Sequence, residues 1–255
     1  MIVVYVSRPV HGPFAAIQRA RNVNQRCILS FNVWHFLTHV PMAHQVKSRI
    51  GIFGGTFDPV HMGHLIMAEQ CREAGQLDQV WFIPAARPPH KQDRPLTPFA
   101  QRAEMLALAI AGMPAFRVEE LEKDRPGPSY TADTLEELTR RHPQTAFALL
   151  LGSDCLPDLP GWHRPERILE LAELLIFARP DWPLLNEDEM RASLRLSGQA
   201  ALRLRVIHAP LINIASRDLR QRAALQRSLR FLVPRAVECY ILEKKLYQGG
   251  VSDQK

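Results

Sequence analysis

Long apolar runs, clustered cysteines and a disorder-prone composition are all absent from this 255-residue chain. No stretch approaches the roughly 18 uncharged apolar residues that a membrane-spanning helix needs, which argues against an integral membrane protein. The 13 glycines and 20 prolines are too few for a collagen-like or wholly disordered chain. The four cysteines form no CxxC pair and no Cys/His metal spacing, which favours reduced thiols in a globular cytoplasmic protein.

Acidic residues are absent from residues 1–57, which hold six of the chain's 32 lysines and arginines. The remaining 26 basic residues are matched by 26 acidic ones, so the rest of the chain is formally neutral. The net charge of +6 is therefore a property of the N-terminal segment. We expect no nucleic-acid and no membrane partner, because no basic face is indicated elsewhere.

Residues 1–46 show no sustained helical or strand period. Their arginine-rich, acid-poor composition would allow an organelle transit peptide, and a functionless tail would look nearly the same. We favour a third interpretation, a translation start at Met42, because an ordered element is expected shortly after it. The predicted organisation is an extension over 1–46 and one folded domain over 47–255.

From Arg49 onward, apolar stretches alternate with helical patterns. Ala146–Leu151 is wholly apolar, which is typical of a central parallel strand covered on both faces. This alternation predicts an α/β fold with a doubly wound parallel sheet, whose ligands bind outside the carboxyl ends of the strands. Thr97 and Thr131 are the expected caps of two helices. The expected strands are 49–53, 80–83, 116–118, 146–151, 174–178 and 204–208, and the expected helices are 63–75, 98–111, 131–141, 165–171, 216–229 and 234–246.

The most informative segment is GIFGGTFDPVHMGHL, residues 51–65. An apolar strand ends in two glycines, which let the backbone approach a ligand closely. A helix opens near Gly63, and the unpaired N–H groups at its start favour an anion such as phosphate. His61 and His64 flank that glycine, so two imidazoles can stabilise one phosphoryl group with no covalent step.

Other interpretations of the histidine pair are weaker. A structural zinc site needs four ligands, and no others are spaced nearby. Either histidine could be a helix cap or a core residue, but the strand, the glycine pair and the helix start all coincide here. No GxxxxGK[ST] or GxGxxG phosphate motif competes with this segment.

The segment GGTFDPVHMGHL resembles the signature of the HxGH nucleotidylyltransferases, and more closely that of the bacterial nicotinate-nucleotide adenylyltransferases. The resemblance runs from about Arg49 to Tyr247. It is supported by matches to a PPHK loop at 84–91, an RxGxSYTxDTL segment within 122–135, a GxD element at 151–154, an ISSTxIR segment at 212–220 and a VPxxVxxYI helix at 232–240. It implies a three-layer, Rossmann-like nucleotidyltransferase domain with C-terminal helices.

The resemblance also implies a reaction and its partners. ATP and nicotinate mononucleotide would give nicotinate adenine dinucleotide and pyrophosphate, as in NAD biosynthesis. Mg²⁺ would arrive with ATP and be bound mainly through substrate oxygens, because no carboxylate cage for a metal is evident. The implied site residues are His61 and His64 for catalysis, Gly54, Gly55, Thr56, Phe57, Lys91, Ser216 and Arg220 for ATP, and Ser129, Tyr130, Thr131, Asp154 and Trp162 for the mononucleotide.

Several of these residues also have a plain structural interpretation. The segment 129–131 lies at a helix start, where free N–H groups could grip the nicotinate carboxylate or the side chains could simply cap the helix. Trp162 could stack on the pyridine ring or belong to the core. Asp154 could accept ribose hydroxyls or cap the next segment. Lys91 could place a charge on phosphate or face solvent.

The ISSTxIR segment departs from its pattern at two positions. Ala215 replaces a hydroxyl residue, and Arg217 stands where threonine is usual, which leaves the role of Arg217 open. Ser216 keeps its match and could donate to a phosphate oxygen while capping a helix. Arg220 also matches and could form paired charge-assisted bonds to phosphate.

Two alternatives to the implied function stay open. One is another HxGH adenylyltransferase, with nicotinamide mononucleotide or phosphopantetheine as acceptor, although the SYTADTL segment and Trp162 argue against phosphopantetheine. The other is a non-catalytic nucleotide sensor that keeps the fold, which the changes at Ala215 and Arg217 leave open. The sequence does not indicate the oligomeric state.

Overall fold

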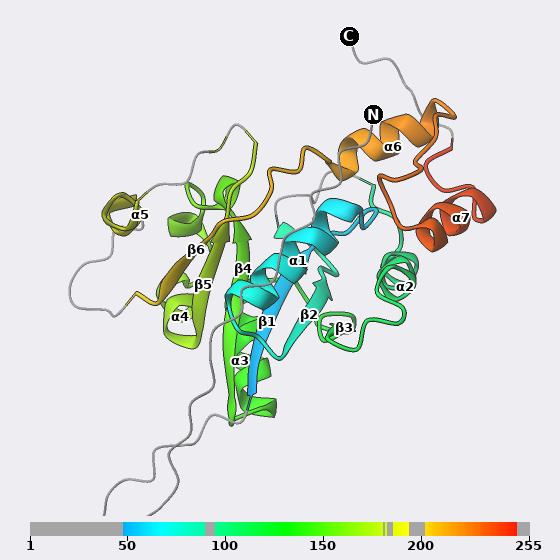
Figure 1. The fold of residues 1–255 in the computed structure, drawn as a ribbon. Helices are drawn as coiled ribbons and strands as arrows, with labels where there is room; N and C mark the ends of the chain where they lie inside the picture. The colour runs from blue at the N-terminus through cyan, green and yellow to red at the C-terminus, as the bar shows by residue number, and fades with distance from the viewer. Residues whose placement is uncertain (1–47, 90–94, 181, 183–185, 194–201, 249–255) are drawn as a thin grey trace, which may run out of the picture. The chain divides into compact units, whose positions relative to one another are not determined.

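The computed structural model describes residues 48–89, 95–180, 182, 186–193 and 202–248 (Figure 1). The extension predicted over 1–46 and the predicted ATP ligand Lys91 lie outside these residues. Within the described part, no helix combines the length and apolar character needed to cross a membrane.

Six parallel strands form one sheet in the order β3-β2-β1-β4-β5-β6. The first strand is central, and the chain winds outward from it in both directions, so the order reverses between β1 and β4 (Figure 1). Such a switch point is where open α/β sheets bind ligands. The strands are β1 Ser48–Gly55, β2 Gln79–Pro84, β3 Phe116–Val118, β4 Thr145–Gly152, β5 Ala172–Phe177 and β6 Leu204–Ile207.

Two layers of helices cover the sheet, and each layer has its own buried cluster. Side chains alternate between the clusters along each central strand, which is why a sequence such as FALLL in β4 is apolar throughout. One layer holds α1 Met62–Ala74, α2 Phe99–Ala109, α6 Ser216–Ala224 and α7 Arg235–Glu243. The other layer holds α3 Thr131–Arg141 and α4 Pro165–Leu171.

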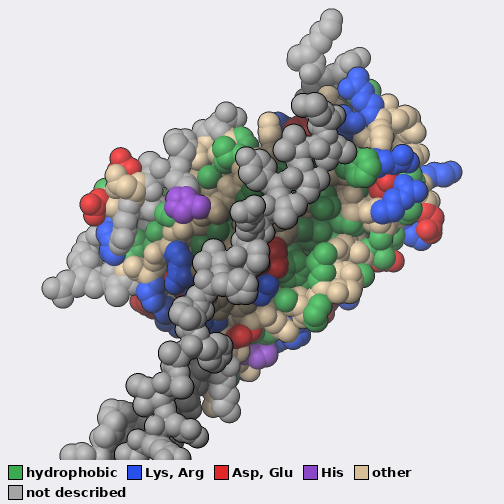
Figure 2. All heavy atoms as spheres, in the orientation of Figure 1, with side chains coloured by type: hydrophobic (Ala, Val, Ile, Leu, Met, Phe, Trp, Pro, Cys, Tyr) green, Lys and Arg blue, Asp and Glu red, His purple; other side chains and the backbone are tan. Residues whose placement is uncertain are grey.

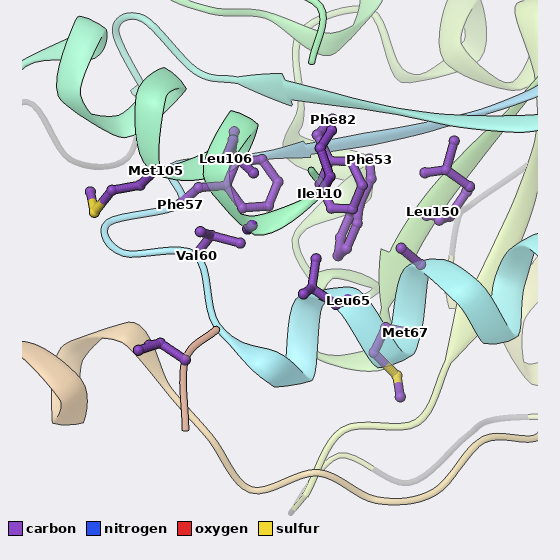
Figure 3. Close-up of a cluster of buried hydrophobic side chains, with 14 of the residues drawn as sticks. Phe53, Phe57, Val60, Leu65, Met67, Phe82, Met105, Leu106, Ile110 and Leu150 are labelled. Carbon is purple, nitrogen blue, oxygen red and sulfur yellow. The ribbon is translucent and has the colours of Figure 1, made fainter. Parts of the chain in front are cut away.

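Figure 3 shows the first cluster beside the start of α1. Phe57 and Val60, from the loop between β1 and α1, point into it together with Phe53 at the end of β1 and Leu65 of α1. Phe57 and Val60 are 2% and 0% exposed. Burial of one such side chain contributes about 1.5–3 kcal/mol to the stability of the fold. The apolar side chains of the loop therefore fix it to the core.

This architecture confirms the predicted doubly wound, three-layer, Rossmann-like α/β fold with C-terminal helices. All six predicted strands are present, and so are the six predicted helices. A short helix, α5 Glu187–Ser193, and two 3₁₀ turns, η2 Ser153–Cys155 and η3 Leu159–Gly161, carried no clear sequence signal.

Several predicted helix ends are wrong. Residue 98 is the N-cap of α2 in place of Thr97, and residue 130 is the N-cap of α3, so Thr131 is the first helical residue. The helix α6 ends at Ala224 because Gln226 adopts a left-handed backbone, with φ 55°. Lys245, with φ 50°, follows the end of α7 in the same way.

Candidate active site

The backbone is bare where β1 ends. A Cβ atom on Gly54 would meet nothing within 4 Å, so a ligand can lie directly against this peptide. A Cβ atom on Gly55 would come within 2.9 Å of the Phe57 ring, which folds back beneath it. The predicted glycine pair therefore has two separate causes, an open approach at the first position and close packing at the second.

The two predicted catalytic histidines lie face to face. The rings of His61 and His64 are stacked with centroids 3.7 Å apart. The backbone N–H of His61 donates to Nδ1 of His64 at 3.2 Å, so the proton of a neutral His64 ring lies on Nε2. A Cβ atom on Gly63 would lie 3.1 Å from Nδ1 of His61, which explains why the residue between the histidines is glycine.

The start of α1 offers an N–H group to an anion. The N–H of Met62 donates to the Leu232 carbonyl at 2.9 Å, and that of His64 donates to the His61 carbonyl at 2.9 Å. The N–H of Gly63 has no acceptor within the described part of the chain. This group and the positive end of the helix point to a phosphate site beside the imidazoles.

His61 is neutral in the free protein. Burial lowers the pKa of this imidazole to about 3, and the positive charge of Arg179 lowers it further in the same direction. The side chain is 2% exposed, and its Nδ1 has no hydrogen-bond partner among the described residues. A buried polar atom of this kind is costly unless a ligand completes it.

Arg179 is a site residue that the sequence analysis missed. It lies two residues beyond β5, with its backbone N–H on the Ser153 hydroxyl at 2.9 Å and its guanidinium 3.7 Å from the Asp154 carboxylate. The available signal was its position just past the carboxyl end of a buried strand. It brings a positive charge to the side of the histidine pair.

The burial of His61 predicts a pH-dependent stability. Its pKa is about 3 when folded and 6.5 in the unfolded chain, so the unfolded state binds the proton more tightly. This contribution to the free energy of unfolding is complete above pH 6.5 and is lost as pH falls toward 3. Between pH 7 and pH 5 we expect a loss of about 2 kcal/mol. Urea unfolding of the wild type and of His61→Gln at both pH values measures it; equal slopes with pH in the two proteins would contradict it.

The segment at 212–220, which is predicted to bind the ATP phosphates, packs against the loop before α1. The Ser216 hydroxyl donates to the Pro59 carbonyl at 2.9 Å, and Nη1 of Arg220 donates to the Asp58 carbonyl at 2.8 Å. The predicted capping role of Ser216 is wrong, because Ala215 is the N-cap of α6 and makes no side-chain bond there. The single hydroxyl proton of Ser216 is used on Pro59, whereas Arg220 keeps further N–H donors for an anion.

Arg217, whose role the sequence left open, lies on the surface. Its side chain is 77% exposed and pairs with Asp218 at 3.2 Å. Figure 2 shows Lys and Arg side chains gathered over α6 and α7. The Arg217 side chain bonds to Asp218, whereas that of Arg220 bonds to the loop at Asp58.

A pocket lies at the start of α3. It has a volume of about 160 Å³ and is lined by four of the predicted mononucleotide residues, Ser129, Tyr130, Thr131 and Trp162. His163, which the sequence analysis missed, closes one wall by stacking on the Tyr130 ring with centroids 4.3 Å apart. The fifth predicted residue, Asp154, does not line this pocket and lies beside Arg179.

Hydrogen bonds join this pocket to Gly55, at the end of β1, through the segment 85–87. The N–H of Ala85 donates to the Gly55 carbonyl at 2.8 Å. The next two N–H groups, of Ala86 and Arg87, both donate to the Ser129 hydroxyl at 3.0 Å. Ser129 therefore acts as a structural tie between two loops, and its hydroxyl oxygen is already used by two donors.

Comparisons with known proteins show the family of the chain. The cytidylyltransferase-like family model matches residues 52–222. A probable nicotinate-nucleotide adenylyltransferase of Thermomicrobium roseum is 46% identical over 201 residues, which are 79% of this chain and 92% of the relative. A protein of the same name from Thermus thermophilus is 44% identical over 200 residues, which are 78% of this chain and 100% of the relative.

Solved structures show the same fold. The nicotinic acid mononucleotide adenylyltransferase of Plasmodium falciparum complexed with NaAD matches with a TM-score of 0.65 and 20% identity, over 78% of this chain and 97% of that chain. The same protein complexed with APC matches with a TM-score of 0.64 and 19% identity, over the same shares.

Proposed function

This chain belongs to the nicotinate-nucleotide adenylyltransferases, within the cytidylyltransferase-like proteins, and we propose that it transfers the adenylyl group of ATP to nicotinate mononucleotide. The products are nicotinate adenine dinucleotide and pyrophosphate, and the reaction belongs to NAD biosynthesis. The observation that carries the proposal is the chain of hydrogen bonds from Gly55 through 85–87 to Ser129. It joins the proposed phosphate-binding loop after β1 to the pocket at the start of α3, at the carboxyl ends of the strands.

The chemistry is an in-line substitution at the α-phosphorus of ATP. An oxygen of the mononucleotide phosphate forms the new P–O bond while the bond to the β-phosphate oxygen breaks and pyrophosphate leaves. The nucleophile is already an anion, so no general base is required. Catalysis then rests on positioning and on neutralising charge as it develops.

The histidine pair supplies donors to the transferring phosphoryl group. His64 donates through Nε2, because Nδ1 accepts the His61 backbone N–H. His61 is neutral until the nucleotide arrives, and the negative charge of bound phosphates favours its protonation. Arg179 adds a fixed positive charge to the same side of the site.

ATP is held by backbone and by one guanidinium. The residues Gly54, Gly55, Thr56 and Phe57 present backbone along the phosphates, and Arg220 contributes charge. Ser216 positions the loop through the Pro59 carbonyl. Lys91 is a further proposed contact to ATP, and only its sequence match supports this role.

The pocket at the start of α3 takes the nicotinate ring. Trp162 offers an aromatic face for the ring, and the backbone N–H of Thr131, the first residue of α3, is the proposed donor to the carboxylate. The Tyr130 N–H donates to the Pro128 carbonyl at 3.1 Å, so Tyr130 contributes its ring to the pocket. Asp154 accepts ribose hydroxyls nearer the histidines.

Mg²⁺ enters with ATP as part of the substrate. The described residues hold no group of three or more His, Cys, Asp or Glu that could bind a metal ion. The triphosphate oxygens would serve as its main ligands, and the ion would neutralise charge on the pyrophosphate.

The cysteines are consistent with a cytoplasmic location, which we propose for the protein. Cys71, Cys155 and Cys239 all carry free thiols. Burial raises the pKa of Cys71 and of Cys155 to about 12, so neither is a reactive thiolate.

An assay with ATP, Mg²⁺ and one mononucleotide tests the reaction. We expect nicotinate mononucleotide to give dinucleotide and pyrophosphate, with kcat/KM at least about tenfold above that for nicotinamide mononucleotide, because the helix N-terminus favours the acid. Preference for the amide would change the acceptor. Absence of product with either would favour the nucleotide-sensor alternative.

The pocket assignment makes a separate prediction. Trp162→Ala removes the stacking face, so KM for the mononucleotide should rise by about 3- to 10-fold. KM for ATP should stay constant in the same variant, because Trp162 lines the pocket at the start of α3 and the proposed ATP residues 54–57 do not. Steady-state kinetics with each substrate varied in turn measures both, and a matching rise in KM for ATP would contradict the assignment.

A further inference from the structure

The carboxylate of Asp58 is buried in the loop that leads to His61, and both of its oxygens are occupied. The Tyr247 hydroxyl donates to Oδ1 at 2.7 Å, and the Thr97 backbone N–H donates to Oδ2 at 3.3 Å. Asp58 is 3% exposed. Each carboxylate oxygen therefore has a donor from a distant segment, and the buried side chain serves as an internal anchor.

The backbone of the same loop is held by other distant residues. Arg102, which is 1% exposed, donates to the Thr56 carbonyl at 2.7 Å. Arg220 donates to the Asp58 carbonyl, and Ser216 donates to the Pro59 carbonyl. Each of these contacts fixes one peptide, whereas Tyr247 fixes the loop through the side chain of Asp58.

Tyr247 is a permanent donor in this arrangement. Burial raises the pKa of its hydroxyl far above the ordinary value, and the neighbouring Asp58 charge raises it further. Its backbone has φ 62°, just beyond the end of α7, so the chain turns to bring the ring inward. Without this hydroxyl, Oδ1 of a buried carboxylate would lack its partner, a loss of the kind that displaces or repacks a loop.

We propose that Tyr247 is a positioning residue for adenylyl transfer, holding Asp58 so that the loop from Thr56 to Pro59 presents His61 and His64 at the α-phosphorus. The inference rests on the proposed function for its kinetic consequence. A catalytic group displaced by about 1 Å costs on the order of 10²-fold in rate, so a partial displacement is measurable.

Tyr247→Phe tests the proposal, with Tyr240→Phe as its matched control. Tyr240 also donates from a C-terminal segment to a carboxylate at 2.7 Å, but its partner is Glu104 of α2 and not a residue of the histidine loop. Tyr247→Phe should lower kcat by about tenfold with KM for ATP unchanged, and Tyr240→Phe should stay within about twofold of wild type. Similar melting temperatures for the two variants separate positioning from general stability. Equal kcat values in the two variants would overturn the proposal.

A second measurement does not depend on activity. Hydrogen–deuterium exchange of peptides covering 54–65 should be faster in Tyr247→Phe than in wild type, and unchanged in Tyr240→Phe. If wild type forms no dinucleotide, the proposed function fails while this exchange still tests the hold on the loop. Unchanged exchange in Tyr247→Phe overturns the positioning role.

The pair can be examined as a unit. Asp58→Asn removes the charge but keeps the shape of the side chain, and we expect a fall in kcat comparable to that of Tyr247→Phe. Because both act through one bond, the double variant should lose little beyond the larger single effect. Multiplicative losses in the double variant would show that Tyr247 acts elsewhere and would overturn the inference.

Discussion

Replacing His64 with alanine should reduce kcat by about 10²- to 10³-fold while leaving the fold intact. His64 is half-buried, and its ring makes edge contacts with Phe57 and Phe53 at 5.0 and 5.9 Å between centroids. Both phenylalanines belong to the first buried cluster. The ring also stacks on His61 and accepts its backbone N–H, so the alanine variant loses these local contacts together with the proposed donor to the phosphoryl group.

His142→Ala is the matched control for this prediction. His142 is also half-buried and packs edge-on against an aromatic ring, that of Trp81, at 5.1 Å between centroids. It precedes β4, at the amino end of that strand, whereas the candidate site lies at the carboxyl ends of the strands. Both variants should unfold at similar temperatures, and only His64→Ala should lose turnover. Turnover of His64→Ala near that of His142→Ala would remove the phosphoryl role from this histidine.

Replacing Arg220 with alanine should lower kcat/KM for ATP by about 10²-fold. The change removes a guanidinium that donates to the Asp58 carbonyl and that we propose to bind the ATP phosphates with its remaining donors. Arg220→Lys keeps one charge but cannot make paired bonds, so its kcat/KM should lie between those of Arg220→Ala and wild type.

Arg217→Ala is the matched control for Arg220→Ala, because it also removes one positive charge from α6. It lies in the same helix three residues earlier, carries the same charge, and pairs with the exposed Asp218. Its kcat/KM should stay within about twofold of wild type, since exposed ion pairs contribute little. Equal losses in Arg217→Ala and Arg220→Ala would mean that the general surface charge of α6 attracts ATP, and that Arg220 makes no specific contact.

The parts that could be predicted from the sequence are those encoded locally. The histidine pair, the glycines and the helix start lie within one stretch of 15 residues, 51–65, so the geometry of a strand, a turn and a helix brings them together. The parallel strands were predictable because burial on both faces makes each central strand apolar throughout.

The parts that could not be predicted depend on contacts between distant segments. Tyr247 and Asp58 are 189 positions apart, and no local pattern marks either as the partner of the other. Ser129 was predicted as part of a helix start that binds the mononucleotide, and the backbone N–H groups at 86–87 that bond to its hydroxyl lie more than 40 positions away. The helix ends at Ala224 and Glu243 were missed because left-handed residues that are not glycine stop both helices.

The sheet has α1 and α6 on one face and α3 and α4 on the other. Under the proposed function, nucleotide activation therefore belongs to the first layer and acceptor choice to the second, with the strands between them. Substitutions in the α3–α4 layer can thus alter which mononucleotide is accepted without rebuilding the machinery that handles the triphosphate. A change of acceptor in the evolution of such an enzyme needs remodelling of one layer only.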